Sequence, residues 1–351
     1  MTTIDIRDTE HWAALLRTEP RRPVLVHLNG DTTWLLQLPC PPSGGTRRRR
    51  SHFNLLIDPW LHGPQSDVAP WFSTQRHVVA PAVPSLAALQ ALLRELDDDP
   101  DAAAGNPEPD GDPRAMIHAV AVSHEFTDHC HRATLQELPR DTPVYAADAA
   151  AELIRSWHFF DAVTTAPGLL AGTPWRSLPG TLLPAWLRVG RLVTPGNSLY
   201  YHSALVVAFD LGAGTHAEAV VYSPHGVAAR DLSAALAGNK EEEDLAALAV
   251  LHGLHDVRLA PFVRQLNLGA LNGVEAVRAA RARYWVGTHD EEKKGRGLIA
   301  PLLRRTRYTL RHAVAHDEKR RSREAGGGGR EDEEPGYVFK ELASGEALLL
   351  K

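Results

Sequence analysis

Cysteine is scarce in this chain, which has only Cys40 and Cys130 among its 351 residues. Two cysteines exclude a disulfide framework and suit a reducing compartment, so we expect a cytoplasmic protein. Long apolar runs are also missing: no stretch approaches the length needed to cross a bilayer. Residues 1–22 lack the apolar core of a signal peptide. We therefore expect no membrane span.

An excess of positive charge is the third thing that the sequence lacks. The formal net charge is −5 and no basic domain is appended, so neither nucleic acid nor an anionic membrane surface is expected as a partner. What the chain does have is 44% hydrophobic residues, enough to bury the core of one large domain or two small ones. It also has 18 histidines, a high number that hints weakly at metal binding.

The most informative stretch runs from Ile117 to His131. Its first half is apolar and β-branched and predicts a strand that ends at Ser123. His124, Asp128 and His129 follow within six residues. Imidazole and carboxylate are common ligands of zinc and other borderline divalent ions, and a tight loop at a strand end can aim several of them at one point. The alternative is a helix N-terminus with capping polar residues and incidental histidines.

Strand and helix patterns alternate along the chain, as in a layered α/β fold. The hydrophobic patterns predict strands at 24–28, 34–38, 53–57, 117–123, 143–146, 192–193, 198–209, 219–226, 257–261 and 285–287. They predict helices at 9–17, 84–96, 131–138, 148–157, 231–251, 273–284 and 300–316, with Asn272 capping the sixth. Residues 29–31 form a hairpin turn signal, and residues 97–114 have the composition of a flexible insertion.

The segment Ser123-His124-x-x-x-Asp128-His129 resembles the first metal motif of the metallo-β-lactamase superfamily, His-x-His-x-Asp-His. His124, Asp128 and His129 match three of its four ligands, whereas Phe126 stands at the second and cannot bind metal. The paired strands that lead into Asp58 resemble the lactonase-like and phospholipase-D-like branches, which include many poorly characterised fungal members. The resemblance implies that Asp58 supports the metal loop; a strand-terminating turn is the alternative.

The resemblance also implies ligands later in the chain. His202 lies near the start of a strand, in the place of the third ligand of the first metal site, and His225 stands where the superfamily has a bridging aspartate. His289 follows the strand at 285–287 and matches the final ligand, with Asp290 and Glu291 as candidate outer acceptors for an imidazole N–H. For His252 and His255 we favour a structural role, because helix C-termini attract histidine.

As a whole, the resemblance implies a four-layer αββα sandwich over residues 1–318, with the metal loops along one edge. Strands from 24 to 57 and at 120–122 would build one sheet, and those from 199 to 261 with 284–287 the other. Residues 319–335 are predicted to form a disordered linker, and 336–351 a strand-like tail that returns as a final edge pair.

The implied function is metal-dependent hydrolysis of an ester, lactone, amide or phosphodiester in a small-molecule substrate. Zinc, or another divalent transition metal, would be the cofactor, and Asp128 would both ligate it and orient the attacking water. One ion is expected rather than two, because Phe126 removes a ligand and His225 replaces a bridging carboxylate; His131 could compensate. The alternative is a catalytically degenerate member of the fold that serves as a binding or scaffold module. Loops 59–75 and 159–189 would line the pocket, and neither the substrate nor the oligomeric state follows from the sequence.

Overall fold

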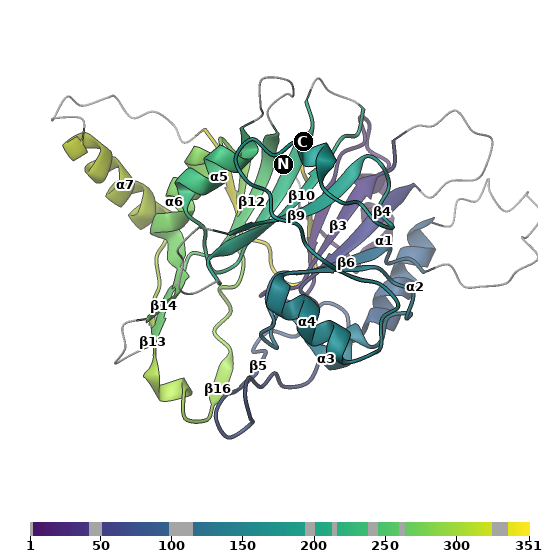
Figure 1. The fold of residues 1–351 in the computed structure, drawn as a ribbon, viewed down its shortest axis with the longest axis horizontal. Helices are drawn as coiled ribbons and strands as arrows, with labels where there is room; N and C mark the ends of the chain where they lie inside the picture. Colours follow the sequence, from purple (N-terminus) through teal and green to yellow (C-terminus); the bar gives the residue numbers. More distant parts are fainter. Residues whose placement is uncertain are drawn as a thin grey trace, which may run out of the picture. The chain divides into compact units, whose positions relative to one another are not determined.

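Two sheets contain most of the strands that the structure describes, and they belong to different parts of the chain (Figure 1). The computed structural model describes residues 3–41, 51–97, 115–193, 201–212, 216–237, 245–259, 264–324 and 336–351. The predicted insertion therefore lies outside the described residues, apart from Asp97. The chain divides into a first unit, Met1–Gln65 with Val79–Thr165 and Leu342–Lys351, and a second unit, Ser66–Val78 with Ala166–Glu341.

The first unit contains the eight-stranded sheet. Its strands, in spatial order, are β1 (Thr3–Asp5), β19 (Glu346–Leu349), β2 (Val24–His27), β3 (Trp34–Pro39), β4 (His52–Ile57), β6 (Ala119–Val122), β7 (Val144–Ala146) and β8 (Val163–Thr165). Pairing is antiparallel as far as β4 and parallel from β4 to β8. The predicted hairpin joins β2 to β3, and Gly30 in its turn has φ +75°, which glycine adopts without steric cost. Every residue of β6 is buried, as expected for a parallel strand in the middle of a sheet.

The described residues of the first unit form the α-helices α1 (Thr9–Leu16), α2 (Leu86–Asp97), α3 (Arg132–Leu135) and α4 (Asp148–Ser156). Helix α2 confirms the predicted amphipathic pattern, because Leu86, Leu89 and Leu93 are all buried in the core. Helix α1 is tied to the sheet through its tryptophan: Trp12 Nε1 donates to Gln37 Oε1 at 2.8 Å. These helices cover apolar sheet surface, so the unit has the α/β character that the sequence predicts.

The second unit contains the six-stranded sheet, in the order β18 (Val338–Lys340), β15 (Tyr284–Val286), β12 (Ala246–His252), β11 (Glu218–Ser223), β10 (Ser203–Phe209) and β9 (Leu187–Val193). A three-stranded sheet is formed by β13 (Asp256–Leu259), β14 (Arg264–Leu268) and β17 (Leu303–Thr306), and a two-stranded one by β5 (Thr74–Arg76) and β16 (Lys294–Arg296). The helices are α5 (Ala229–Leu236), α6 (Gly269–Ala279) and α7 (Leu310–Glu324), with 3₁₀ turns η2 (Trp175–Ser177) and η3 (Ala300–Leu302).

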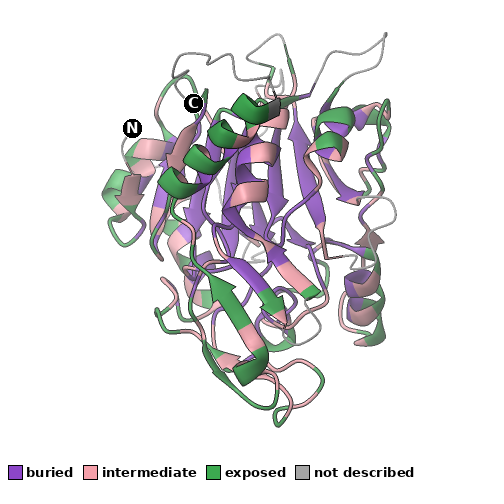
Figure 2. Cartoon of the chain, turned by 90° about the vertical axis from the view of Figure 1, so that its left-hand side faces the viewer, coloured by how far each residue is buried: buried purple, intermediate pink, exposed green. Residues whose placement is uncertain are grey.

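The predicted helix at 231–251 is wrong from residue 245 onward, and residues 238–244 lie outside the described part of the chain. The structure ends α5 at Leu236 and places β12 in the interior of the sheet, parallel to both β11 and β15. Residues 247–252 are all buried (Figure 2). A strand buried on both faces has no polar residue at every second position, and this alanine-rich run therefore resembles a helix in sequence.

Three other predicted elements need correction. Helix α6 begins at Gly269, so Asn272 lies inside the helix and does not cap it. Residues 300–316 are not one helix but η3, β17 and the start of α7, which continues to Glu324, into the predicted linker. Residues 325–335 lie outside the described part of the chain.

The strands near the C-terminus are present but do not pair with each other. Strand β18 pairs with β15, whereas β19 lies between β1 and β2 in the other sheet, where it is not an edge strand. Strand β13, which we expected in the second main sheet, pairs instead with β14 and β17. Among the described residues, no helix is both long enough and apolar enough to cross a membrane.

Candidate functional site

A fully buried carboxylate organises the candidate site in the first unit. Asp58 directly follows β4, has φ +45° and is not exposed at all. Its backbone N–H donates to the Ala121 carbonyl at 3.0 Å, which extends the pairing of β4 with β6. One carboxylate oxygen accepts the Ser123 backbone N–H at 2.7 Å, and the other accepts the Ser123 hydroxyl at 2.5 Å. Asp58 thus holds the point where β6 turns into the histidine loop.

The same carboxylate orients His129. The Nδ1–H of His129 donates to Asp58 Oδ2 at 2.6 Å, and neither side chain is exposed. Because a carboxylate only accepts hydrogen bonds, this contact sets the tautomer and leaves the lone pair on Nε2. A carboxylate behind an imidazole is the usual outer partner of a metal-binding histidine. Asp128 lies on the lone-pair side, with Oδ1 3.7 Å from His129 Nε2.

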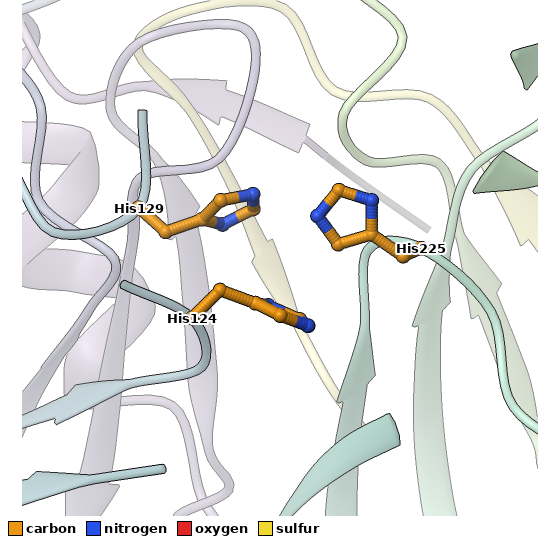
Figure 3. Close-up of side chains that lie close together, drawn as sticks. All are labelled: His124, His129 and His225. Carbon is orange, nitrogen blue, oxygen red and sulfur yellow. The ribbon is translucent and has the colours of Figure 1, made fainter. Parts of the chain in front are cut away.

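His124 is held by the next link of the same network. The Ser123 hydroxyl donates to Asp58 and therefore accepts from His124 Nδ1, at 2.8 Å, so this imidazole also keeps its lone pair on Nε2. The rings of His124 and His129 lie 5.1 Å apart between centroids on the loop after β6 (Figure 3). Phe126, at the position of the missing ligand, stacks on His124 with 6.1 Å between centroids and 18° between planes. The loop thus presents two imidazoles and one carboxylate.

His131 has a structural role. It is the N-cap of α3, where its Nδ1 accepts from the backbone N–H of Thr134 at 3.3 Å and contacts the Thr134 hydroxyl at 2.9 Å. Since Nδ1 accepts, the neutral ring carries its proton on Nε2. His131 therefore has no lone pair to offer a metal unless the cap is lost, which argues against the compensating role that the sequence left open.

In the second unit, an amide orients His225. This residue follows β11 after one intervening residue, Pro224, and is 7% exposed. Its Nδ1–H donates to Asn267 Oδ1 at 2.8 Å, and its backbone carbonyl accepts from Leu268 N–H at 2.9 Å. Strand β14 therefore holds both the backbone and the ring, and the lone pair of His225 is again on Nε2. The ring of His225 is drawn in Figure 3.

His289 lies beside His225 in the same unit. It follows β15 in the left-handed region with φ +59°, is 8% exposed, and packs edge-on against His225 with 5.0 Å between ring centroids. Their parent strands, β11 and β15, are separated in the sheet only by β12. Two predicted ligands that are far apart in the sequence are thus brought together.

The two acidic residues after His289 hold the backbone of other segments. The carboxylate of Asp290 accepts the backbone N–H groups of Leu254 and His255, each at 2.7 Å. Glu291 accepts the Val78 N–H and the His77 Nδ1–H, both at 2.6 Å. These contacts tie the turn before β13 and the segment after β5 to the residues that follow β15. The predicted contact of either carboxylate with an imidazole ligand stays a prediction.

His202 precedes β10 and is half-buried. Its Nε2 donates to the Leu266 carbonyl at 3.3 Å, and burial lowers the pKa of its ring below the ordinary value of 6.5, so the neutral form is favoured. His252 ends β12, also with its pKa lowered by burial, and its Nε2 lies 2.9 Å from the Asn272 side chain. Asn272 also accepts from the Val227 N–H and donates to its carbonyl, so it fixes the chain after His225 and does not cap a helix.

Asn267 and Ser123 are the functional candidates that sequence reasoning missed. Ser123 adjoins the motif, and the sequence pattern predicts only that it ends a strand. Asn267 lies 42 residues from His225, on a strand that the sequence did not predict, so no local signal connects the two. Only the pairing of β14 with β13 brings the amide to the histidine.

No protein-family model matches the chain, and no curated protein matches it. Solved structures do. The isothiocyanate hydrolase from Delia radicum gut bacteria is 17% identical, with a TM-score of 0.50 over 93% of this chain and 99% of that one. A possible metal-dependent hydrolase from Veillonella parvula DSM 2008 is 16% identical, with a TM-score of 0.51 over 94% and 100%.

A third solved structure is the metallo-beta-lactamase fold protein YhfI from Bacillus subtilis, 15% identical with a TM-score of 0.41 over 93% of this chain and 98% of that one. At these identities structural similarity shows the fold and does not assign an activity. The fold class predicted from the sequence, α/β of the metallo-β-lactamase type, is confirmed.

Proposed function

We propose that the chain is a metal-dependent hydrolase that cleaves an ester, lactone, amide or phosphodiester in a small-molecule substrate. The observation that carries the proposal is the pair of outer hydrogen bonds, from His129 to Asp58 and from His225 to Asn267. Each bond occupies Nδ1 and leaves the lone pair of a buried imidazole on Nε2, which is how proteins prepare histidine for a metal.

The ligands that we propose are His124, Asp128 and His129 in the first unit, with His225 and His289 in the second. The Nδ1 of His129 is already bonded to Asp58, so only its Nε2 can ligate. We propose a mononuclear site because Phe126 stands in place of one imidazole and His225 in place of a bridging carboxylate. Imidazole nitrogens with one carboxylate oxygen suit zinc or another borderline divalent ion.

A divalent ion held there would supply a Lewis acid that makes bound water acidic near neutral pH and polarises a carbonyl or phosphoryl group. The protein's own residues would do the rest. Asp128 would orient the attacking water and accept its proton, because its carboxylate lies beside the His129 lone pair. Asp58 and Asn267 would keep the two imidazoles in the ligating tautomer. Phe126, stacked on His124, would exclude water from one side of that ligand.

The first test is elemental mass spectrometry of protein grown and purified with metal and without chelator. We expect about one zinc, iron or manganese ion per chain in the wild type and a loss of most of it in both Asp128→Ala and His289→Ala. His312→Ala is the matched control, because His312 is exposed on α7. Metal that persists in both ligand variants would contradict the proposed ligand set, and two ions per chain would contradict the mononuclear site.

The second test is hydrolysis by the metal-loaded protein of a panel of esters, lactones, amides and phosphodiesters. An isothiocyanate belongs in the panel because one protein of the same fold is described as an isothiocyanate hydrolase. Turnover that is lost in Asp128→Ala would support the proposal. A chain that binds no metal under replete conditions would contradict it and favour the alternative, a binding or scaffold module on the same fold.

A further inference from the structure

The second unit carries a surface feature that the proposed hydrolase chemistry does not use. We call it the basic lobe and define it as residues 66–78 and 293–307. Strands β5 and β16 pair antiparallel within it and lie side by side (Figure 1). Two backbone hydrogen bonds extend the pairing: Leu298 N–H donates to the Trp71 carbonyl at 3.2 Å, and Ile299 N–H donates to the Phe72 carbonyl at 3.1 Å. The two segments, more than 200 residues apart in the sequence, therefore form one structural element.

The basic lobe exposes large apolar side chains. Val68 is 85% exposed, Trp71 66% and Leu298 61%. Trp71 makes an edge-on contact with Phe72, at 5.9 Å between centroids. Residues 294–298, of which the first three form β16, are all exposed (Figure 2). Exposed tryptophan and aliphatic side chains gathered on one projection lose contact with water when a partner covers them, so such a group is typical of an interaction surface.

Positive charge is concentrated on the same element. The basic lobe holds seven lysine and arginine residues against one acidic residue, Asp67, in a chain with a net charge of −5, and one of the seven, Arg307, pairs with Glu292 just before the lobe. Within it, Lys294 on β16 lies directly opposite Arg76 on β5. Like charges at directly opposite positions of an antiparallel pair destabilise it. Neither of these two side chains has an ion-pair partner among the described residues, so a negatively charged partner would relieve the repulsion.

We propose that the basic lobe binds the surface of an anionic phospholipid bilayer. Trp71 and Leu298 would enter the headgroup region with their apolar parts, while Arg76, Lys294 and Arg296 would face the lipid phosphates. A single-stranded nucleic acid would use the cations and could stack on Trp71, but it gains little from the aliphatic side chains of Val68 and Leu298. A second copy of this chain would bring the same cations face to face across a two-fold axis.

The net charge of the whole chain predicts no anionic membrane surface as a partner, and the basic lobe is our reason to revise that prediction. Association with a surface depends on the charge within about one Debye length of the contact, roughly 10 Å. The basic lobe carries its own positive field on that scale, whatever the sum over the remaining residues. The proposed binding is peripheral and reversible, and it does not depend on the proposed hydrolase activity.

The test is co-sedimentation of the full chain with phosphatidylcholine vesicles that contain or lack phosphatidylglycerol. We expect binding to the anionic vesicles only, weakened by added salt. Lys294→Glu with Arg296→Glu should lower the partition coefficient by about tenfold or more, because each basic residue near an anionic surface contributes substantially. Trp71→Ser with Leu298→Ser should lower it by a similar factor. All four positions are exposed, so these changes leave the core intact.

Two matched controls lie elsewhere in the second unit. Leu170 is 60% exposed, which is nearly the same fraction as for Leu298. The side chain of Arg230 is 81% exposed. Leu170→Ser and Arg230→Glu should bind vesicles like the wild type, and far-ultraviolet circular dichroism should show all variants folded.

Three results would overturn the proposal. The first is no vesicle binding by the wild type, or equal binding to both vesicle types that no lobe variant changes. The second is a concentration-dependent dimer, measured by light scattering, that Trp71→Ser with Leu298→Ser dissociates while vesicle binding is absent. The third is a gel shift of a single-stranded RNA oligonucleotide that Lys294→Glu with Arg296→Glu abolishes, again without vesicle binding.

Discussion

The imidazole rings of His129 and His225 are held in the same tautomer by hydrogen-bond partners of different chemistry. In the first unit the Nδ1–H of His129 donates to the carboxylate of Asp58, and in the second that of His225 donates to the amide of Asn267. Both bonds fix the tautomer, but only the carboxylate adds a negative charge behind the ring. A charged partner raises the basicity of the imidazole and strengthens its bond to a metal, and it must itself be fully hydrogen-bonded because it is buried. The orientation of an imidazole ligand and the negative charge behind it are therefore separate contributions to metal binding, since Asn267 provides only the first and Asp58 provides both.

The largest effect is expected from removing the charged partner. Asp58→Ala leaves the Ser123 N–H and His129 Nδ1–H without an acceptor, so we expect unfolding to become easier by about 3 to 5 kcal/mol. Metal affinity should fall by about 10- to 100-fold. Urea unfolding and competition with a chelator measure the two. Asp161→Ala, at an exposed carboxylate, is the control. Unchanged affinity would show that the carboxylate does not act on the metal site.

The next effect concerns a buried histidine that has no carboxylate partner. Burial, with a smaller effect from the Arg21 charge, lowers the pKa of His52 to about 4, and its Nε2 has no hydrogen-bond partner. The unfolded chain takes up this proton near pH 6.5 and the folded chain only near pH 4. The contribution of His52 to the free energy of unfolding is therefore constant above about pH 6.5. As the pH falls from 6.5 to 4, this contribution decreases by up to about 3 kcal/mol.

His52→Gln should remove this contribution, so its free energy of unfolding should fall less steeply over that pH range. Urea titrations at several pH values, with His312→Gln as an exposed control, measure the slopes. Equal slopes for the wild type and His52→Gln would mean that the folded chain protonates His52 readily. The measurement shows how a buried imidazole titrates when it lacks a carboxylate acceptor of the kind that Asp58 provides for His129.

Exchanging the neutral partner tests the other half of the comparison. We expect Asn267→Ala to lower metal affinity by about tenfold, because His225 loses the bond that orients its ring. Asn267→Asp should restore or exceed the wild-type affinity, since a carboxylate accepts the same Nδ1–H and adds charge. Chelator competition measures both variants. If Asn267→Ala and Asn267→Asp bind metal equally well, the amide has no positioning role.

The smallest effect is expected at the histidine that resembles a ligand but is a cap. His131→Ala should destabilise the chain by about 1 kcal/mol, the usual cost of losing an N-cap acceptor. Its metal content should equal that of the wild type. Urea unfolding and elemental analysis on one preparation give both values. A loss of metal in His131→Ala would return this residue to the ligand set.

Local patterns predicted much of the fold correctly. The hairpin between β2 and β3, helix α2 and strand β6 follow from a turn signal, a helical repeat of leucines and a run of β-branched residues. Each signal lies within one stretch of chain, where backbone preference and side-chain burial favour the same structure. The loop after β6 was predictable for the same reason: its three candidate ligands are neighbours in the sequence.

Prediction failed where burial overrides local preference. Strand β12 is an alanine-rich run that is strand only because the sheet buries both of its faces, and α6 starts three residues before the predicted asparagine cap. The same limit applies to the candidate site. Nothing near Asn267 in the sequence marks it as a partner of His225, whereas Asp58 was recognised through a family resemblance.

The sequence by itself determined which side chains can bind metal, since imidazole and carboxylate chemistry belongs to residue type. It also determined that His124, Asp128 and His129 share one loop. Only the tertiary structure decided which ring nitrogen carries the lone pair, because that depends on the hydrogen-bond partner of the other nitrogen. Asp58 and Asn267 accept the Nδ1–H of His129 and His225, so both of these rings keep the lone pair on Nε2. Thr134 donates to Nδ1 of His131, which therefore has the opposite tautomer. These partners reach the rings through strand pairing and helix capping.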